Sequence, residues 1–268
     1  MADELVGDYD VRPISLRRMM TIDGLDAVTP GHRTYGLVEL DVTLAQARIT
    51  ALQQAGEQVT LFAFVVACIA KALGEQPELN AIRSARRIYR FTDVDVSLAI
   101  EVDTPDGPHP YQYALRRAQT KGALDIHAEI AAARARHAAH EAIGSESRRF
   151  EAAMRWMLWL PRFMRVALLR LTTRFPLVVK RWTGTTFVTS VGKFARMPGF
   201  VIPFAAGPMA VSFALGSVVD KPVLRGGELR NHAFLAMTVI VNHDLVDGGP
   251  AARFVARLQA LIEGAVGL

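Results

Sequence analysis

The chain has 268 residues, 51% of them apolar and 21% charged, which is enough for a substantial core in one large domain or two small ones. Its one cysteine, Cys68, excludes an internal disulfide and a cysteine-rich metal site, and its apolar surroundings, LFAFVVACIAKAL, favour a buried, inert thiol. The formal charge is +5, but it is unevenly distributed, because the segment from Ser147 to Trp182 contains nine Lys and Arg residues and one acid, Glu151. The remaining chain is therefore mildly acidic, and the net charge does not indicate nucleic-acid binding.

The first half of the chain shows strand-like and helix-like patterns in the order strand 35–43, helix 44–56, helix 59–76, strand 93–102, turn 103–107 and helix 122–143. The helix over 59–76 is apolar on nearly every side, which predicts burial, and Gly74 and Pro77 end it. The polar, acidic N-terminus lacks the pattern of a secretory signal. We therefore expect a cytoplasmic protein, with a membrane-associated form as the alternative.

The second half carries three strand-like runs, at 185–192, 208–230 and 233–244, and a closing helix over 249–266. The middle run is expected to turn back on itself at Gly226-Gly227, and Pro250 is acceptable in the first turn of the helix. Strands and helices are mixed without a steady alternation. This order favours an α+β layered domain over a doubly wound one.

The stretch VNHDLVDGGPAARF, Val241–Phe254, places His243 at the end of a very apolar strand, four residues before Asp247 and a Gly-Gly turn. Such a strand end can hold a side chain toward a cleft, and an imidazole can exchange protons near neutral pH. The residues alone fit equally well a histidine packed in the core, with Asp247 capping the helix that follows.

Five ordered segments resemble the catalytic domain of the 2-oxoacid dehydrogenase acyltransferases, a family with the chloramphenicol acetyltransferase fold. They are ISLRRMM, VTLFAFVVACIAKALGEQPELNA, SLAIEVDTPDG, GTTFVTSVG and HDLVDGGPAARFVARLQALIE. The resemblance covers about Arg12 to Val266, apart from the basic segment. It implies an α+β fold, with a layered mixed sheet and flanking helices, in a homotrimer whose active sites lie at subunit interfaces. Residues 1–268 would then form a single acyltransferase catalytic domain, with a basic, apolar helical insert at about 147–182.

The resemblance also implies roles for individual residues. His243 matches the general base, which takes the proton from an acceptor thiol or hydroxyl as it attacks an acyl-CoA thioester. Aligned on Gly192, Thr189 matches the hydroxyl that stabilises the oxyanion, and Ser190 is its neighbour. These two face opposite sides of an extended strand, so only one can reach the oxyanion, and we favour Thr189. In a trimer, His243 of one chain would face Thr189 of the next.

Supporting residues and cofactors follow from the same resemblance. Asp247 matches an acid that holds the loop around the histidine, and Arg17 or Arg18 is expected to pair with it. Coenzyme A is expected as the acyl carrier and no metal is expected. No residues can be assigned to coenzyme A contact from the sequence.

The sequence departs from the family pattern in three places. No lipoyl domain is recognised, so lipoate is expected only if another protein carries it, and the acceptor is either such a lipoyl protein or a small molecule. The family's Asp-His-Arg is Asn242-His243-Asp244 here, which changes the charge beside the base. After DTPDG the chain reads PHPYQYALRR, which supplies three candidates for lining a substrate channel: His109, Tyr111 and Tyr113.

The basic segment is the least familiar part of the chain. Its arginines interrupt every apolar run, so residues 154–182 should not span a bilayer, and Pro161 and Pro176 should break them into separate helices. Aromatic residues with spaced arginines suit packing against the same or other trimers, with arginines snorkelling, and equally a peripheral membrane contact. The segment lacks the signature of a nucleic-acid-binding fold.

We therefore expect an acyl-CoA-dependent acyltransferase that uses a thiol or hydroxyl acceptor, in a trimer that could assemble further. The alternative is a non-catalytic trimeric scaffold of the same fold that contacts a membrane or partner through the basic segment. The acyl group and the acceptor, which could also be a lipid, are not specified by the sequence.

Overall fold

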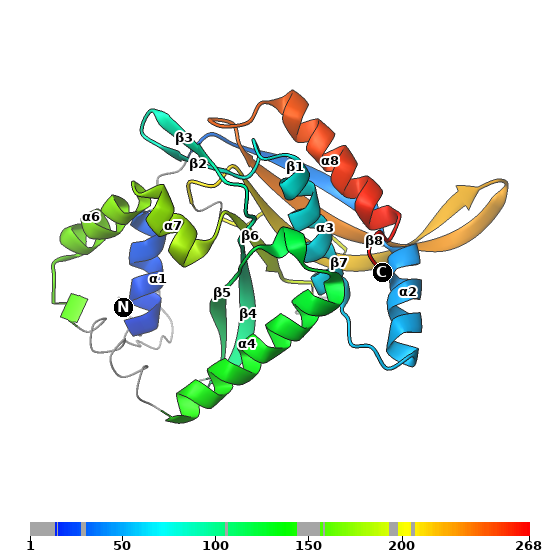
Figure 1. Cartoon of the computed structure of the whole chain (residues 1–268), viewed down its shortest axis with the longest axis horizontal. Coiled ribbons are helices and arrows are strands. Elements are labelled where there is room, and N and C mark those ends of the chain that lie inside the picture. Colours follow the sequence, from blue (N-terminus) through cyan, green and yellow to red (C-terminus); the bar gives the residue numbers. More distant parts are fainter. Residues whose placement is uncertain are drawn as a thin grey trace, which may run out of the picture.

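The computed structural model describes residues 16–27, 31–104, 107–143, 156–157, 159–192, 198–204 and 207–268, together with Ile14. Its centre is one twisted sheet with long helices packed on one face, and two further helices, α1 and α6, stand beside it (Figure 1). The predicted α+β layered architecture is confirmed in this part of the chain.

The central sheet has six strands in the order β1-β8-β7-β6-β4-β5. Their bounds are Arg33–Asp41 (β1), Val96–Thr104 (β4), Gly107–Leu115 (β5), Thr186–Ser190 (β6), Val211–Arg225 (β7) and Glu228–Asn242 (β8). β6 runs parallel to β4 and β7, and the other neighbours are antiparallel. The sheet is therefore mixed, as predicted. A small separate hairpin is formed by β2 (Ala81–Ser84) and β3 (Arg87–Arg90).

Four helices cover one face of this sheet: α2 (Thr43–Gln54), α3 (Leu61–Glu75), α4 (Ala123–Ile143) and α8 (Gly248–Glu263). α3 is the most apolar of them and is buried along most of its length, as the sequence predicts. The Thr60 hydroxyl caps it by accepting a hydrogen bond from the Ala63 N–H, at 3.2 Å. The helices and the near face of the sheet share one apolar core.

None of α2, α3, α4 and α8 lies on the opposite face of the sheet. Met237, Val239 and Val241 of β8 belong to the helix-side core, so the alternate residues Thr238 and Ile240 lie on the other face. In the pairing of β1 with β8, Leu37 lies opposite Thr238 and Tyr35 lies opposite Ile240. The β1 residues Leu37 and Tyr35 are 47% and 42% exposed. Among the described residues this face is therefore exposed at its β1 edge, whereas Thr238 and Ile240 of β8 are buried.

The described part of the basic segment forms two helices, α6 (Arg162–Thr173) and α7 (Pro176–Thr183). Pro161 immediately precedes α6 and Pro176 begins α7, which confirms the two predicted breaks. α6 packs against α1 (Leu16–Ala27) at one side of the molecule (Figure 1). Residues 144–155, at the start of the segment, lie outside the described residues. Within the described part, every helix is too short or too polar to cross a bilayer.

The sequence missed one strand of the central sheet and both strands of the small hairpin. β5 contains Pro108 and Pro110, which hide its strand character, but it lies at the edge of the sheet and pairs only with β4. An edge strand tolerates proline because one side of its backbone needs no partner. The turn of the β7–β8 hairpin at Gly226-Gly227 is where the sequence predicts it, with φ of 60° and 85°.

Candidate active site

His243 lies in a tight turn between the end of β8 and the start of α8. Its N–H donates to the carbonyl of His32 at 2.8 Å, and the carbonyl of Asn242 accepts from the N–H groups of Leu245 and Val246. Val246 is buried in the core and fixes the middle of the turn. The imidazole is 50% exposed, so the backbone is held while the side chain stays open to solvent. A packed core histidine, the alternative that the sequence left open, is excluded.

Asp247 is a charged group beside the His243 ring. Its Oδ1 lies 3.9 Å from Nδ1 of His243, which is an ion-pair distance and too long for a hydrogen bond. Asp247 occupies the N-cap position of α8, but its side chain makes no capping hydrogen bond and is 87% exposed. With Nδ1 turned toward this carboxylate, Nε2 is the nitrogen free to accept a proton.

Asp244, the residue that departs from the family pattern, points away from this pair. Its carboxylate lies 2.8 Å from Nδ1 of His32 and 2.9 Å from Nη1 of Arg83, and its side chain is 22% exposed. The hydrogen bond from His32, and then the positive charge of Arg83, hold the pKa of the Asp244 carboxyl below its usual value. Asp244 therefore fastens the turn to two other parts of the chain, a role that the sequence analysis missed.

Thr189 and Ser190 end β6 on opposite faces of the sheet. In the parallel pairing with β7, Ser190 is level with Leu215, a residue of the helix-side core, and Thr189 is level with Ala214. Thr189 thus lies on the sheet face opposite the helices, together with Thr238 and Leu37. The end of the strand is closely packed, because a Cβ on Gly192 would lie 2.1 Å from the carbonyl oxygen of Gly216.

Within one chain the structure does not bring Thr189 and His243 together. Thr189 is level with Thr238 of β8, five positions before His243. A strand rises about 3.3 Å per residue and neighbouring strands are about 4.8 Å apart, so about 16 Å along β8 and two strand spacings separate the residues. A single chain does not place this hydroxyl and this imidazole around one carbonyl group.

The other predicted residues are placed less directly. Arg18 is exposed on α1, and the side chain of Arg17 lies outside the described residues, so their pairing with Asp247 stays a prediction. Tyr113 donates to Glu129 of α4 at 2.8 Å, and burial followed by that hydrogen bond raises its pKa to about 12. Tyr113 is thereby fixed against α4. The side chain of His109 lies outside the described residues.

Cys68 takes no part in this region. It is buried in α3, and loss of solvent around the thiol raises its pKa to about 12, so the predicted inert thiol is confirmed. The described residues include no group of three or more His, Cys, Asp or Glu side chains that could hold a metal ion.

A comparison of the sequence with models of protein families identifies the family of this chain. The model of the 2-oxoacid dehydrogenases acyltransferase catalytic domain matches residues 9–147 and 178–268. The chain belongs to the 2-oxoacid dehydrogenase acyltransferase family. Most of the basic segment, including all of α6, falls between the two matched stretches.

Two curated members of the 2-oxoacid dehydrogenase acyltransferase family illustrate its range. The dihydrolipoyllysine-residue acetyltransferase component of the pyruvate dehydrogenase complex of Mycoplasma pneumoniae is 27% identical over 223 residues, which cover 81% of this chain and 45% of the relative. The mitochondrial dihydrolipoyllysine-residue succinyltransferase component of the 2-oxoglutarate dehydrogenase complex of Bos taurus is 26% identical over 204 residues, covering 75% and 36%. The chain thus spans less than half the length of these relatives.

A solved structure confirms the fold of this acyltransferase family. The dihydrolipoamide acetyltransferase of Azotobacter vinelandii matches 97% of this chain and 94% of its own, with a TM-score of 0.70 at 18% identity. Its study concerned the role of a serine, a histidine and an asparagine in the catalytic mechanism. The layered mixed sheet predicted from the sequence is therefore the fold of known acyltransferases.

Proposed function

We propose that this protein is an acyltransferase that moves an acyl group between coenzyme A and a thiol or hydroxyl acceptor, with His243 as the general base. The observation that carries the proposal is the His243 turn: a half-exposed imidazole on a fixed backbone, with Nδ1 toward Asp247, in a chain of this family. A general base needs this combination of access and orientation.

Each group has a defined task in this proposal. Nε2 of His243 takes the proton of the acceptor thiol or hydroxyl as its sulfur or oxygen attacks the thioester carbonyl. The attack places negative charge on the carbonyl oxygen, and a donated O–H from Thr189 stabilises it. The oxyanion then re-forms the carbonyl and expels the coenzyme A thiolate, which recovers the proton from His243. Asp247 lies on the Nδ1 side of the ring, away from the nitrogen that exchanges the proton.

Spacing in the Azotobacter vinelandii protein supports the roles of His243 and Asp247 and directs the search for the hydroxyl donor to Thr189 and Ser190. There the asparagine follows the histidine by four positions and the serine precedes it by 52. Here Asp247 follows His243 by four positions, and Ser190 and Thr189 precede it by 53 and 54. We favour Thr189 because it lies on the sheet face opposite the helices, whereas Ser190 is level with residues of the core.

The separation of Thr189 and His243 within one chain supports a site shared between two copies. Each copy exposes Tyr35 and Leu37 of β1 on the sheet face opposite the helices, and a second copy would cover these two side chains. We propose the homotrimer of the family arrangement, in which His243 of one chain meets Thr189 of the next. The named complexes of the relatives further support a lipoyl group on another protein as the acceptor.

His243→Ala tests the proposal. With acetyl-CoA or succinyl-CoA as donor and dihydrolipoamide as acceptor, release of free coenzyme A should fall by at least about 10²-fold, as expected for loss of a general base. His127→Gln on α4 is the matched control and should keep its activity, because His127 lies on the surface of a different element. Equal turnover by wild type and His243→Ala, or no turnover by wild type with either donor, would favour the non-catalytic scaffold.

A further inference from the structure

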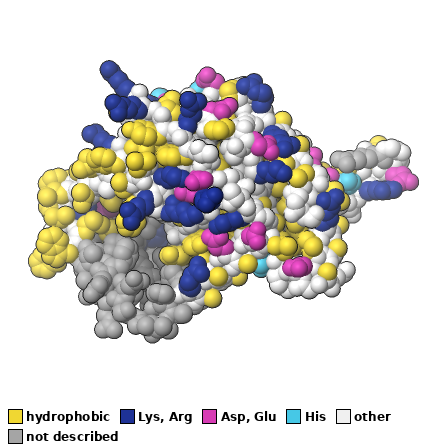
Figure 2. All heavy atoms as spheres, viewed as in Figure 1, with side chains coloured by type: hydrophobic (Ala, Val, Ile, Leu, Met, Phe, Trp, Pro, Cys, Tyr) yellow, Lys and Arg dark blue, Asp and Glu magenta, His cyan; other side chains and the backbone are white. Residues whose placement is uncertain are grey.

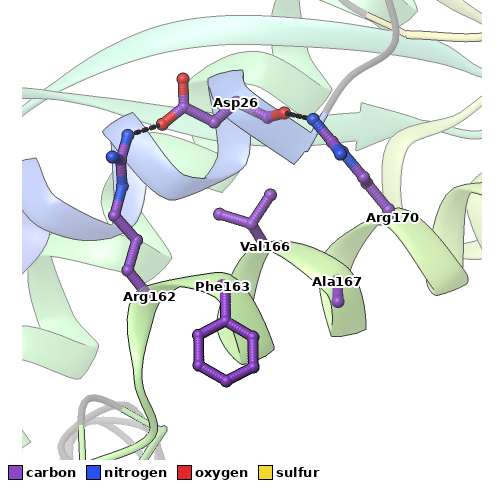
Figure 3. A pocket seen from close by; sticks show the side chains of 6 residues that line it. All are labelled: Asp26, Arg162, Phe163, Val166, Ala167 and Arg170. Atoms are coloured by element: carbon purple, nitrogen blue, oxygen red, sulfur yellow. Dashed lines mark hydrogen bonds and ion pairs between the residues drawn. The ribbon is translucent and has the colours of Figure 1, made fainter.

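The helix α6 presents its charged side chains to the protein and its apolar side chains to solvent. Arg165 contacts the buried Asp23 of α1 at 2.6 Å, and these side chains are 12% and 2% exposed. Arg162 pairs with Asp26, and Arg170 donates to the Asp26 carbonyl at 3.0 Å. Figure 3 shows Arg162 and Arg170 reaching from α6 to Asp26, while the Phe163 ring points the other way. These ion pairs fix which side of α6 faces outward.

The outward side of α6 continues over α7 as one apolar surface, which we call the outer apolar face. It is formed by large side chains that are 39–89% exposed: Trp156, Trp159, Phe163, Met164, Leu168, Leu171, Phe175, Leu177, Val178 and Trp182. Figure 2 shows hydrophobic side chains gathered at this side of the molecule. A surface helix ordinarily buries its apolar stripe, so this reversed arrangement indicates a contact that the described residues do not supply.

Basic side chains without acidic partners lie beside this face. Arg174 directly follows α6, and Arg181 lies in the last turn of α7. Arg86 and Arg87 lie in the β2–β3 hairpin. This hairpin contacts the end of α6 through a hydrogen bond from Ser84 Oγ to the Arg174 carbonyl, at 2.6 Å. Among the described residues, none of these four arginines has a carboxylate within 4.0 Å. The surface therefore combines exposed aromatic and leucine side chains with unpaired positive charge (Figure 2).

The charge decides between two occupants of the outer apolar face. A second copy docked face to face would place arginines of both copies along the same border, and like charges would oppose that contact. An anionic bilayer surface accepts both features, because aromatic and leucine side chains enter the acyl-chain boundary while arginines meet phosphate groups. Since no described helix can cross a bilayer, the contact would be peripheral.

We propose that α6 and α7 dock this protein on the surface of an anionic lipid bilayer through the outer apolar face and its bordering arginines. Docking would localise the protein at a membrane surface, and it does not depend on catalytic activity. The side chains replaced in its test, Phe163, Leu168 and Leu171, lie on α6, whereas His243 lies between β8 and α8, so failure of one proposal leaves the other standing.

Flotation of the full chain with lipid vesicles tests the docking. Wild type should float with vesicles of phosphatidylcholine and phosphatidylglycerol, and much less with phosphatidylcholine alone. The triple variant Phe163→Ser, Leu168→Ser, Leu171→Ser should lose at least about tenfold in partitioning, since it removes three inserted apolar side chains. The control is Leu224→Ser with Leu229→Ser, at the tip of the β7–β8 hairpin, where the two leucines are 68% and 70% exposed. The control should float as wild type does.

A second variant tests the charge. Arg174→Gln with Arg181→Gln should weaken flotation with the anionic vesicles and reduce its dependence on salt. Circular dichroism checks that all variants are folded, which we expect because the replaced side chains are exposed. Failure of wild type to float with anionic vesicles, or equal flotation by the triple variant, overturns the proposal. A third outcome also overturns it: wild type does not bind vesicles, and light scattering shows a lower molecular mass for the triple variant than for wild type. That outcome would assign the outer apolar face to contact with a second protein chain.

Discussion

At the scale of single residues, the two hydroxyls that end β6 are distinguished by the face on which each lies. Thr189 lies on the face opposite the helices and Ser190 is level with the core residue Leu215. Thr189→Ala should therefore slow turnover by roughly 10²–10³-fold, the usual cost of one oxyanion donor, while Ser190→Ala should change it little. Steady-state kinetics of the two variants decide the assignment. The opposite ranking would move the donor to Ser190.

Asp244 offers a second test at this scale, because it fastens the His243 turn without touching the ring. Asp244→Asn removes the ion pairs with His32 and Arg83, and the turn should loosen. A shift of the catalytic ring of about 1 Å can cost up to about 10²-fold in rate, so turnover should fall although no catalytic group is lost. Unchanged turnover would show that the backbone hydrogen bonds hold the turn by themselves.

The same ion pairs predict a pH dependence of stability. The pKa of Asp244 is lower in the folded protein than in the unfolded chain, so its contribution is complete above the unfolded value near 4 and is lost as pH falls through the lower, folded value. The melting temperature of wild type should exceed that of Asp244→Asn near neutral pH. The difference should shrink below about pH 4, when Asp244 becomes protonated. A constant difference down to lower pH would contradict this origin.

At the scale of elements, the attachment of α6 depends on a buried charge on α1. Asp23 is 2% exposed and pairs with Arg165, whereas Asp26 is 41% exposed and pairs with Arg162. Asp23→Asn should destabilise the α1–α6 contact by about 3–5 kcal/mol, because the buried ion pair between Asp23 and Arg165 would lose one of its two charges. Asp26→Asn is the matched control and should cost under about 1 kcal/mol.

Hydrogen exchange measures this difference directly. Amides of residues 162–173 should exchange faster in Asp23→Asn, while those of α3 and the central sheet keep their protection. Faster exchange throughout the chain would mean that α6 is part of the main cooperative unit. Equal exchange in both variants would contradict the importance of the Asp23–Arg165 pair.

At the scale of the whole molecule, the distance between Thr189 and His243 makes activity a property of the assembly. His243→Ala and Thr189→Ala are each expected to be nearly inactive as separate proteins. If they are unfolded together and refolded as a mixture, some interfaces should join the intact His243 of one chain to the intact Thr189 of the next. In randomly mixed trimers, roughly a quarter of the interfaces should combine the two intact residues, because each of the two chains is the required variant about half of the time.

Activity of the refolded mixture, compared with each variant refolded alone, measures this complementation. Recovery toward a quarter of wild-type activity supports a site built from two chains. No recovery would show that each chain supplies a complete site, and would contradict the proposed arrangement. The single domain over residues 1–268, the assembly of trimers into larger particles and the cytoplasmic location stay predictions.

The sequence by itself determined the family, most of the elements and the position of the candidate base, because these depend on local order along the chain. Apolar periodicity, the stops at Gly74 and Pro77, the breaks at Pro161 and Pro176 and the HDLVDGG turn are all readable over a few neighbouring residues. Tertiary structure alone decided three further points: the edge position that lets β5 contain prolines, the use of Asp244 to fasten the turn, and the outward direction of the apolar side of α6. Each of these depends on partners that are distant in sequence, Arg83 for Asp244 and Asp23 for Arg165. A pattern of neighbouring residues does not identify the charged residue, distant in sequence, with which a side chain will form an ion pair.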